Sequence, residues 1–317
     1  MKPESVNEGP PPSSAPYRSD GPVAIVGVGL TGASWGALFA AHGRSVRLFD
    51  QDSSVALAGL ERARSFVRFL IKHELADAEL AATGLKNLEI CMDIETAVQD
   101  VVFVQEAVYD SYEAKMAVFK AIDQSAPRHA LISSSSSGLS ISKIQTSTNH
   151  PERCLSGHPY NPPHLIPIVE IAPGDLTDPD AIQAAKEFYS SVGKIPVVLR
   201  REVPGYLANR MSAALWREAI NLVLSGVASV EDVDNAIRYG PGLRWSVMGP
   251  HMLYHLGGGE GGIRYHIDHL TKTKEGMLQD MDDWKSMPAL TSDALEAGLP
   301  PLEEISDLAS ERDEKLA

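Results

Sequence analysis

The chain has 317 residues, of which 44% are hydrophobic, and its 28 basic and 42 acidic residues give a net charge of −14. This length is sufficient for two domains with buried cores. The negative charge excludes nucleic acid and anionic membranes as general partners, because both would be repelled.

Cysteine and apolar content bear on the compartment. The sequence has two cysteines, Cys91 and Cys154, so a disulfide framework is excluded and a reducing compartment is favoured. No segment of the sequence reaches the roughly 20 apolar residues that span a bilayer. Residues 1–20 are rich in proline and resemble neither a secretory signal nor a transit peptide, so we expect a disordered tail. A cytoplasmic protein follows by default.

The ordered chain is predicted to start at residue 21 with a strand, a helix and a second strand. Val23–Val26 is an uninterrupted apolar run, typical of a buried parallel strand. A helix follows from about Leu30 to His42, where Gly43 provides a left-handed C-terminal cap. Ser45–Phe49 is the second predicted strand.

Strands and helices continue to alternate up to residue 200. A long helical stretch is expected over Ser53–Leu80, with a break near Glu74, and further helices over Tyr112–Gln124 and Pro179–Ser191. The remaining predicted strands are Leu88–Cys91, Val101–Val104, Ala130–Ser133, Arg153–Gly157, Ile168–Ile171 and Ile195–Leu199. This alternation predicts a doubly wound, mostly parallel sheet. The connections after Ser156 are shorter, which allows some antiparallel strands there.

The pattern changes after Arg200, because no further strands are predicted. We expect one long helix over Gly205–Ser225 and a second over Val230–Tyr239, with Ser229 as its N-cap. The sequence therefore predicts an α/β domain over residues 21–202 and an all-α domain over residues 203–317.

A glycine pattern separates the first predicted strand from the first helix, and it consists of Gly27, Val28, Gly29, Leu30, Thr31 and Gly32. The first glycine makes a tight turn, the second admits a pyrophosphate, and the third lets helix and strand pack closely. The pyrophosphate then lies at the positive end of the helix. In this context the pattern predicts a Rossmann-type dinucleotide site formed by these residues.

Asp50, at the end of the second predicted strand, indicates which dinucleotide is bound. A carboxylate at this place accepts hydrogen bonds from the adenosine ribose of NAD and repels the 2′-phosphate of NADP. The next residues, Gln51 and Asp52, offer no arginine for that phosphate. We therefore predict NAD as the cofactor. The competing interpretation of Asp50 is a turn or helix cap.

A proline-rich turn separates His158 from Glu170, and a turn of this length can bring the two side chains together. Oxidation of an alcohol needs a base for the hydroxyl proton, and an imidazole held by a carboxylate supplies one. A structural histidine is the competing interpretation. Ser133–Ser137 follows another strand and either faces the ligand crevice of the sheet or is a low-complexity loop.

Two other chemistries are disfavoured. One is that of a serine hydrolase, whose nucleophile lies on a sharp turn between a strand and a helix. The G-x-S-x-G match in the sequence, Gly32–Gly36, instead lies inside the predicted helix Leu30–His42. We also expect no metal, because no cysteine cluster accompanies the loosely spaced histidines His251, His255, His266 and His269.

Three patterns in this order resemble the 3-hydroxyacyl-CoA dehydrogenase family over nearly the whole ordered chain. The first is the glycine pattern described above. The second is H-x-x-N-P followed by V-E, here His158, Asn161, Pro162, Val169 and Glu170. The third is P-G-(F/Y)-x-x-N-R, here Pro204, Gly205, Tyr206, Asn209 and Arg210.

The resemblance implies roles for several residues. His158 would be the catalytic base and Glu170 its partner, while Ser137 and Asn209 would approach the substrate oxygen. The position of the serine within the run Ser133–Ser137 stays open by one residue.

Glu106 and Lys115 match family positions beside the cofactor. Within the family, the chain resembles the short members L-gulonate 3-dehydrogenase with lambda-crystallin, through Ser133–Leu139, and L-carnitine dehydrogenase, through Gly257–Arg264. These members act on small 3-hydroxy acids without coenzyme A. They are dimers through the helical domain, so the resemblance implies a homodimer here.

Four residues of the helical domain are candidates for substrate contact. Arg244 can bind a carboxylate through two hydrogen bonds, although a surface ion pair explains it equally well. Trp245, together with Tyr254 and Glu260, can hold a quaternary ammonium group through cation–π contact and charge. Core packing or an interface contact is the alternative for these three residues.

Three functions follow from these observations. The first is NAD-dependent oxidation of the 3-hydroxyl of a small hydroxy acid, of the L-gulonate or L-carnitine kind. The second is a true 3-hydroxyacyl-CoA dehydrogenase, in which arginines near Arg62 would contact coenzyme A. The third is a non-catalytic crystallin-like or NAD-sensing protein, which would have no physical need for the His158–Glu170 pair.

Overall fold

A computed structural model describes residues 17–317, apart from the side chain of residue 270. The predicted tail, residues 1–20, therefore lies outside the described residues except for residues 17–20, of which Tyr17 packs against the hydrophobic core. The chain divides into two compact units. The first unit runs to Leu207 and includes Asp313–Ala317, and the second is Ala208–Arg312.

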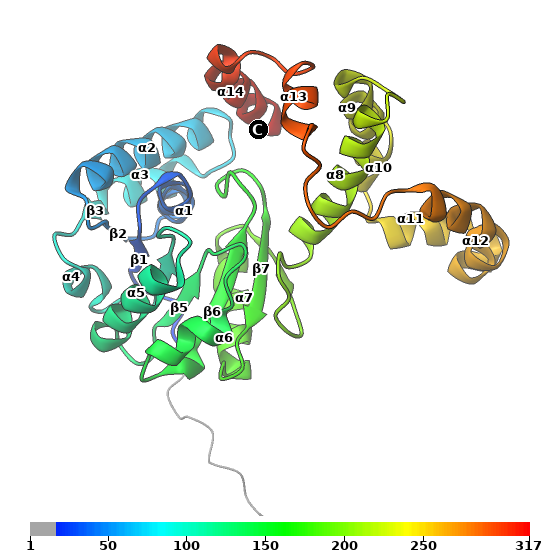
Figure 1. Ribbon diagram of the computed structural model, residues 1–317. Helices are drawn as coiled ribbons and strands as arrows, with labels where there is room; N and C mark the ends of the chain where they lie inside the picture. The colour runs from blue at the N-terminus through cyan, green and yellow to red at the C-terminus, as the bar shows by residue number, and fades with distance from the viewer. Residues whose placement is uncertain (1–16) are drawn as a thin grey trace, which may run out of the picture. The chain divides into compact units, whose positions relative to one another are not determined.

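An eight-stranded sheet organises the first unit, in the order β3-β2-β1-β4-β5-β6-β7-β8 (Figure 1). Neighbouring strands are parallel except for β6 and β7, which are antiparallel. This confirms the predicted mostly parallel sheet, with its antiparallel pair after Ser156. The strands are β1 Val23–Val26, β2 Val46–Phe49, β3 Leu88–Ile90, β4 Phe103–Glu106, β5 Leu131–Ser134, β6 Cys154–Pro159, β7 Ile168–Pro173 and β8 Ile195–Val198.

Both faces of the sheet are buried, as the first strand shows. Val23 and Ile25 belong to one hydrophobic cluster, whereas Ala24 and Val26 belong to another. The first cluster is covered by α1 (Leu30–Ala41), α2 (Ser53–Lys72), α3 (Ala78–Lys86) and α7 (Pro179–Ser191). The second is covered by α4 (Ile94–Val98), α5 (Tyr112–Ser125) and α6 (Ile141–Ile144). Burial on both sides explains why β1 is apolar at every position.

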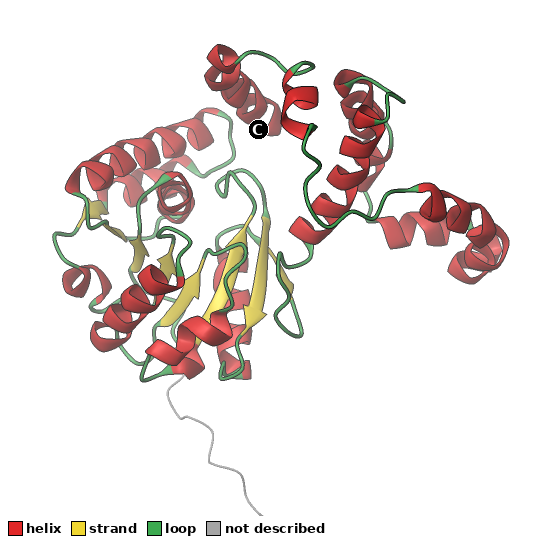
Figure 2. Cartoon of the chain, in the orientation of Figure 1, coloured by secondary structure: helices red, strands yellow, loops and turns green. Residues whose placement is uncertain are grey.

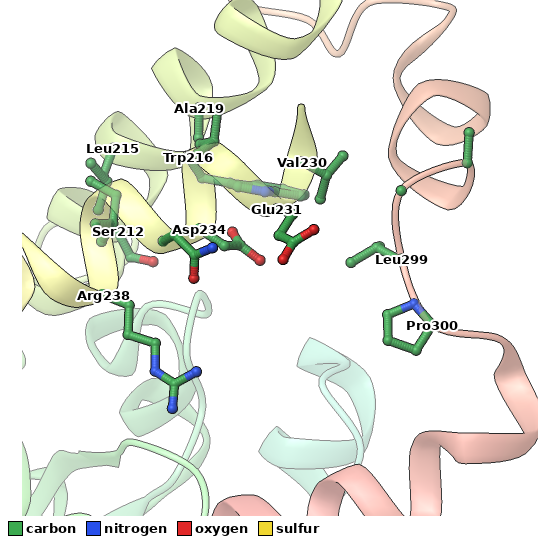
Figure 3. A pocket seen from close by; sticks show the side chains of 15 residues that line it. Ser212, Leu215, Trp216, Ala219, Val230, Glu231, Asp234, Arg238, Leu299 and Pro300 are labelled. Atoms are coloured by element: carbon green, nitrogen blue, oxygen red, sulfur yellow. The ribbon is translucent and has the colours of Figure 1, made fainter. Parts of the chain in front are cut away.

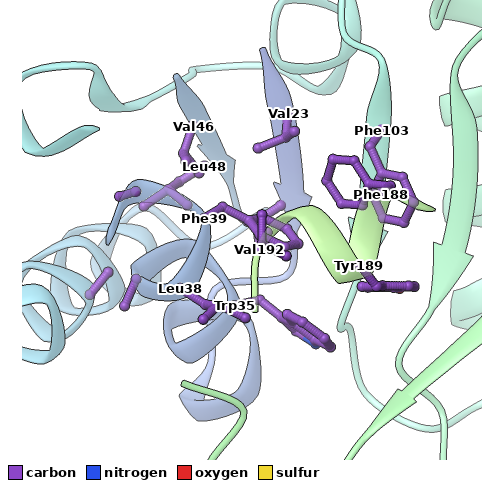
Figure 4. Packing of buried hydrophobic residues seen from close by; sticks show 14 of the residues in the cluster. Val23, Trp35, Leu38, Phe39, Val46, Leu48, Phe103, Phe188, Tyr189 and Val192 are labelled. Atoms are coloured by element: carbon purple, nitrogen blue, oxygen red, sulfur yellow. The ribbon is translucent and has the colours of Figure 1, made fainter. Parts of the chain in front are cut away.

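Stacked aromatic rings fill the first cluster (Figure 4). The rings of Phe103 and Phe188 are stacked, with centroids 3.9 Å apart, and Tyr189 meets Phe103 edge-on at 5.3 Å. Trp35 of α1 stacks on Phe39, one turn further along the helix. These rings fix α1 and α7 against the same face of the sheet.

The predicted helical stretch over Ser53–Leu80 is two helices. The break falls near Glu74 as expected, where a φ of 58° ends α2 in the left-handed region. A new helix begins at Ala78, because the Asp77 side chain accepts hydrogen bonds from the backbone N–H groups of Glu79 and Leu80. The strand predicted over Val101–Val104 also starts later than expected, at Phe103, where it pairs with Val23 of β1.

Among its described residues, the second unit contains helices and no strand (Figure 2). The long helix predicted from Gly205 begins only at Ala208, because Gly205 and Tyr206 both have positive φ, of 76° and 48°. The helices are α8 Ala208–Leu224, α9 Val230–Tyr239, α10 Pro241–Trp245, α11 Pro250–Gly257, α12 Gly262–Asp280, α13 Thr291–Glu296 and α14 Ile305–Leu316, of which the last ends in the first unit. None of the helices described in either unit is both long and apolar enough to cross a membrane.

Candidate functional site

The glycine loop after β1 is residues 27–32. Gly27 and Gly32 are required by the tight turn, and Gly29 leaves space beside the backbone. Gly27 has a φ of 90°, and a Cβ there would lie 2.7 Å from the carbonyl carbon of Ala107. A Cβ on Gly32 would overlap the carbonyl oxygen of Gly27, whereas a Cβ on Gly29 would have no heavy atom within 4 Å. The first turn of α1 has no side-chain cap at Gly29. Its N–H groups therefore suit an incoming pyrophosphate.

Asp50 follows β2 and supports this loop. Its Oδ2 atom accepts a hydrogen bond of 2.9 Å from the backbone N–H of Val28, and its Oδ1 atom accepts one of 3.1 Å from Asp52. The carboxylate therefore forms the turn cap that competed with the cofactor role. Each oxygen has further lone pairs, so the same group can also accept from ribose hydroxyls. The two interpretations do not exclude each other.

His158 and Glu170 face each other across the antiparallel pair β6 and β7, in direct register. The distance from His158 Nδ1 to Glu170 Oε2 is 2.9 Å, and both side chains are buried. Glu170 Oε1 also accepts a 2.8 Å hydrogen bond from the N–H of Leu207. An ionised carboxylate can only accept, so His158 donates from Nδ1 and keeps a lone pair on Nε2. This is the form of imidazole that can take up a proton.

Tyr206 holds the other side of the imidazole, a contact that the sequence did not indicate. Its ring stacks on that of His158 with centroids 4.9 Å apart, and its hydroxyl donates to Ser156 Oγ at 2.9 Å. Burial raises the pKa of Tyr206 to about 12, so the phenol keeps the proton it donates. The sequence analysis named Tyr206 only as part of the pattern that begins at Pro204, and this pattern does not indicate a contact with His158.

A cavity of about 200 Å³ joins the glycine loop to His158 within the first unit. Its lining includes four residues proposed from the sequence, namely Thr31, Lys115, Ser137 and His158. Ser136, the neighbour of Ser137 in the run, is buried and does not line the cavity, whereas Ser135 does.

Glu106 lies next to this cavity and acts on it through Lys115. Glu106 Oε1 accepts from Lys115 Nζ at 2.7 Å and from the N–H of Val108 at 2.6 Å, while Oε2 accepts from Ser134 Oγ. Burial raises the pKa of the Glu106 carboxyl, and the Lys115 ammonium opposes this rise. Asp110 lies 3.3 Å from the same ammonium. Lys115 is therefore held in place at the wall of the cavity.

The remaining predicted substrate residues belong to the second unit. Asn209 lies in the first turn of α8, and Arg244 and Trp245 end α10. Their roles toward the substrate stay predictions. The Tyr254 ring already has a cation over it, because Lys274 Nζ lies 3.4 Å from the ring centroid. This contact disfavours Tyr254 as part of an ammonium site.

A larger cavity, of about 890 Å³, lies wholly within the second unit (Figure 3). It is bounded by α8, α9 and residues 297–300, with Trp216, Glu231 and Asp234 in its wall. None of the site residues proposed from the sequence lines it.

Comparison with known proteins gives consistent results for the two units. Residues 22–203 match the model for the NAD binding domain of 3-hydroxyacyl-CoA dehydrogenase, and residues 205–294 match its C-terminal domain. The chain is 38% identical to an L-carnitine dehydrogenase of Streptomyces griseus over 296 residues, 92% of this chain and 86% of the relative. It is 41% identical to an L-carnitine dehydrogenase of a Pseudomonas species over 244 residues, 77% and 75% of the two chains.

A solved structure of similar fold is that of 5-formyl-3-hydroxy-2-methylpyridine 4-carboxylic acid 5-dehydrogenase, an NAD+-dependent dismutase. The two chains are 27% identical with a TM-score of 0.82, over 93% of this chain and 95% of the other. The family models and the L-carnitine dehydrogenases confirm oxidation of a 3-hydroxyl group as the reaction. The NAD binding domain model and the NAD+-dependent dismutase confirm NAD as the cofactor. The chain belongs to the 3-hydroxyacyl-CoA dehydrogenase family, whose members are NAD-dependent oxidoreductases.

Proposed function

We propose that the substrate is L-carnitine or a closely related small 3-hydroxy acid, and that His158 is the base. The observation that carries the proposal is the 2.9 Å contact between His158 Nδ1 and Glu170, at a cavity that the glycine loop also lines. The choice of L-carnitine is supported by relatives of that name at 38% and 41% identity.

In the proposed mechanism, the glycine loop Gly27–Gly32 and Asp50 would hold NAD, which would supply the hydride acceptor for the substrate carbon. His158 Nε2 takes the proton of the 3-hydroxyl, and Glu170 stabilises the imidazolium that results. Tyr206 and Glu170 together fix the ring, so the lone pair has one direction. Ser137 and Asn209 orient the substrate oxygen, and Arg244 and Trp245 are the candidates for its carboxylate and its ammonium group.

The proposal includes a cytoplasmic homodimer that associates through the helical unit. Support comes from large apolar side chains exposed on that unit, among them Trp216 on α8 and Ile267 on α12. Covering such side chains is the usual source of a stable interface. Light scattering of the purified protein should give twice the mass of one chain, and a single-chain mass would contradict this part.

The test of the substrate is NADH formation with purified protein, NAD and four compounds offered separately. These are L-carnitine, L-gulonate, 3-hydroxybutyrate and 3-hydroxybutyryl-CoA. We expect the highest kcat/KM with L-carnitine. Preference for L-gulonate would replace the substrate, and preference for the coenzyme A ester would overturn the free-acid proposal. NADH binding without turnover of any compound would favour the crystallin-like or NAD-sensing alternative.

A further inference from the structure

A chain of buried hydrogen bonds runs from α7 to the wall of the His158 cavity. The Tyr189 hydroxyl donates to Gln105 Oε1 at 2.6 Å, and Gln105 Nε2 lies 2.7 Å from Ser135 Oγ. Tyr189 and Gln105 are completely buried, whereas Ser135 is partly exposed and lines the cavity. This series of hydrogen bonds therefore connects the hydrophobic core, where Tyr189 lies among the rings of Figure 4, to the His158 cavity.

The direction of these bonds is fixed by the carbonyl oxygen of Gly157. The Gln105 amide nitrogen lies 3.4 Å from this oxygen, which can only accept a hydrogen bond. Rotating the amide would place two acceptors against each other. The NH2 group of Gln105 therefore faces Ser135, and its oxygen faces Tyr189.

This direction determines where each hydroxyl proton points. Tyr189 uses its proton toward Gln105, so Ser133, at 2.8 Å from the same phenol oxygen, must donate to it. Burial raises the pKa of Tyr189, so the phenol keeps that proton. Ser135 accepts from Gln105 and is left with its own proton, in a cavity that also contains His158 and Lys115.

The glycine before His158 is required for this arrangement. A Cβ on Gly157 would overlap the Tyr189 hydroxyl and Ser133 Oγ. The strand that carries His158 thus passes directly over the hydrogen-bond chain.

We infer that Ser135 donates a hydrogen bond to a ligand oxygen in the His158 cavity, and that Gln105 and Tyr189 act as positioning residues for that donor. The inference rests on the proposed function, since the oxygen belongs either to the nicotinamide carboxamide or to the hydroxy acid. Ser135 is thereby distinguished from Ser137, which the family resemblance implies for the reacting hydroxyl.

The experiment compares Ser135→Ala and Ser135→Thr with the wild type. Ser147→Ala is the matched control, because the Ser147 hydroxyl donates to the backbone carbonyl of Ile144 and does not line the cavity. Fluorescence titration gives the dissociation constant of NADH, and steady-state rates give kcat and KM for the best hydroxy acid. Loss of one donor should change the affected constant by about tenfold in Ser135→Ala, with Ser135→Thr close to the wild type.

The constant that changes identifies the oxygen. A weaker NADH complex assigns it to the carboxamide, and a loss in kcat/KM with unchanged NADH binding assigns it to the hydroxy acid. No change in either constant overturns the inference. If the wild type turns over none of the acids, the proposed function fails by itself, and NADH binding alone decides for or against Ser135.

Tyr189→Phe tests the positioning part. It should produce a smaller loss in the same constant, and this loss should vanish when Ser135 is already Ala. Losses that simply add in the double variant would show a structural effect of Tyr189 and would contradict its role through Ser135.

Discussion

The two units bury their apolar residues in different ways. The first covers a sheet on both faces, and strands such as Val23–Val26 are buried at every position. In the second, α8 has one buried residue, Ile220, while Trp216 on the same helix is 53% exposed. The first unit thus has a core of its own and contains the glycine loop and the His158–Glu170 pair. The second presents an apolar surface, on which the proposal of a homodimer rests.

The largest expected effect tests whether the chemistry belongs to the first unit. His158→Ala should lower kcat by about 10²- to 10⁴-fold, because the base for the hydroxyl proton is lost. NADH affinity should stay near that of the wild type. His150→Ala, a histidine beside Glu152 and away from the cavity, is the control. Turnover equal to the wild type would remove His158 from the mechanism.

Substitutions at Gly32 and Gly29 distinguish an effect on folding stability from an effect on cofactor binding in the first unit. Gly32→Ala should lower the free energy of unfolding by about 1–3 kcal/mol, because its Cβ meets the backbone of Gly27. Gly29→Ala should leave that free energy unchanged and raise the dissociation constant of NAD about tenfold. Denaturant titration and calorimetric binding measure the two quantities. Equal NAD affinity in Gly29→Ala and the wild type would argue against a pyrophosphate at this place.

Replacing one exposed isoleucine by glutamate in each unit tests whether the second unit forms the proposed dimer interface. Ile267 on α12 is 52% exposed and Ile195 on β8 is 61% exposed. Ile267→Glu should raise the dissociation constant of the proposed homodimer about tenfold or more, as expected for a buried apolar contact, whereas Ile195→Glu should not change it. Sedimentation equilibrium measures both. The reverse result would move the interface to the edge of the sheet.

The smallest effect is a pH dependence within the first unit. Lys194 Nζ donates to the carbonyl oxygens of Pro163 and Ile166, and burial lowers the pKa of this lysine from 10.5 to about 7. Between these values the unfolded chain binds a proton that the folded chain lacks, so the free energy of unfolding rises with pH. Lys194→Met should lose this rise, and the exposed control Lys186→Met should keep it. Parallel curves for wild type and Lys194→Met would contradict the shift.

The sequence predicted the sheet well because burial on both faces leaves a strong pattern. Val23–Val26 and Val230–Tyr239 have the predicted bounds. The start of α8 was missed because left-handed backbone at Tyr206 leaves no trace in an apolar periodicity. Asp77 was likewise missed as the cap that starts a separate helix, since a single acidic residue is common in helical stretches.

Prediction of the site stopped where contacts depend on three-dimensional register. The proline-rich turn suggested that His158 and Glu170 meet, but only the strand pairing places them directly opposite. Gln105 did offer a signal, as a polar residue within a buried strand. Tyr189 offered none, because an aromatic residue on an amphipathic helix is expected in the core.

The double use of Glu170 has a consequence for how this protein can vary. One oxygen holds His158 and the other holds the N–H of Leu207, directly before α8. Any replacement at position 170 alters the imidazole and the start of the interdomain connection in the same step. A substitution at position 170 would have to keep both hydrogen bonds, so few residue types can replace this glutamate.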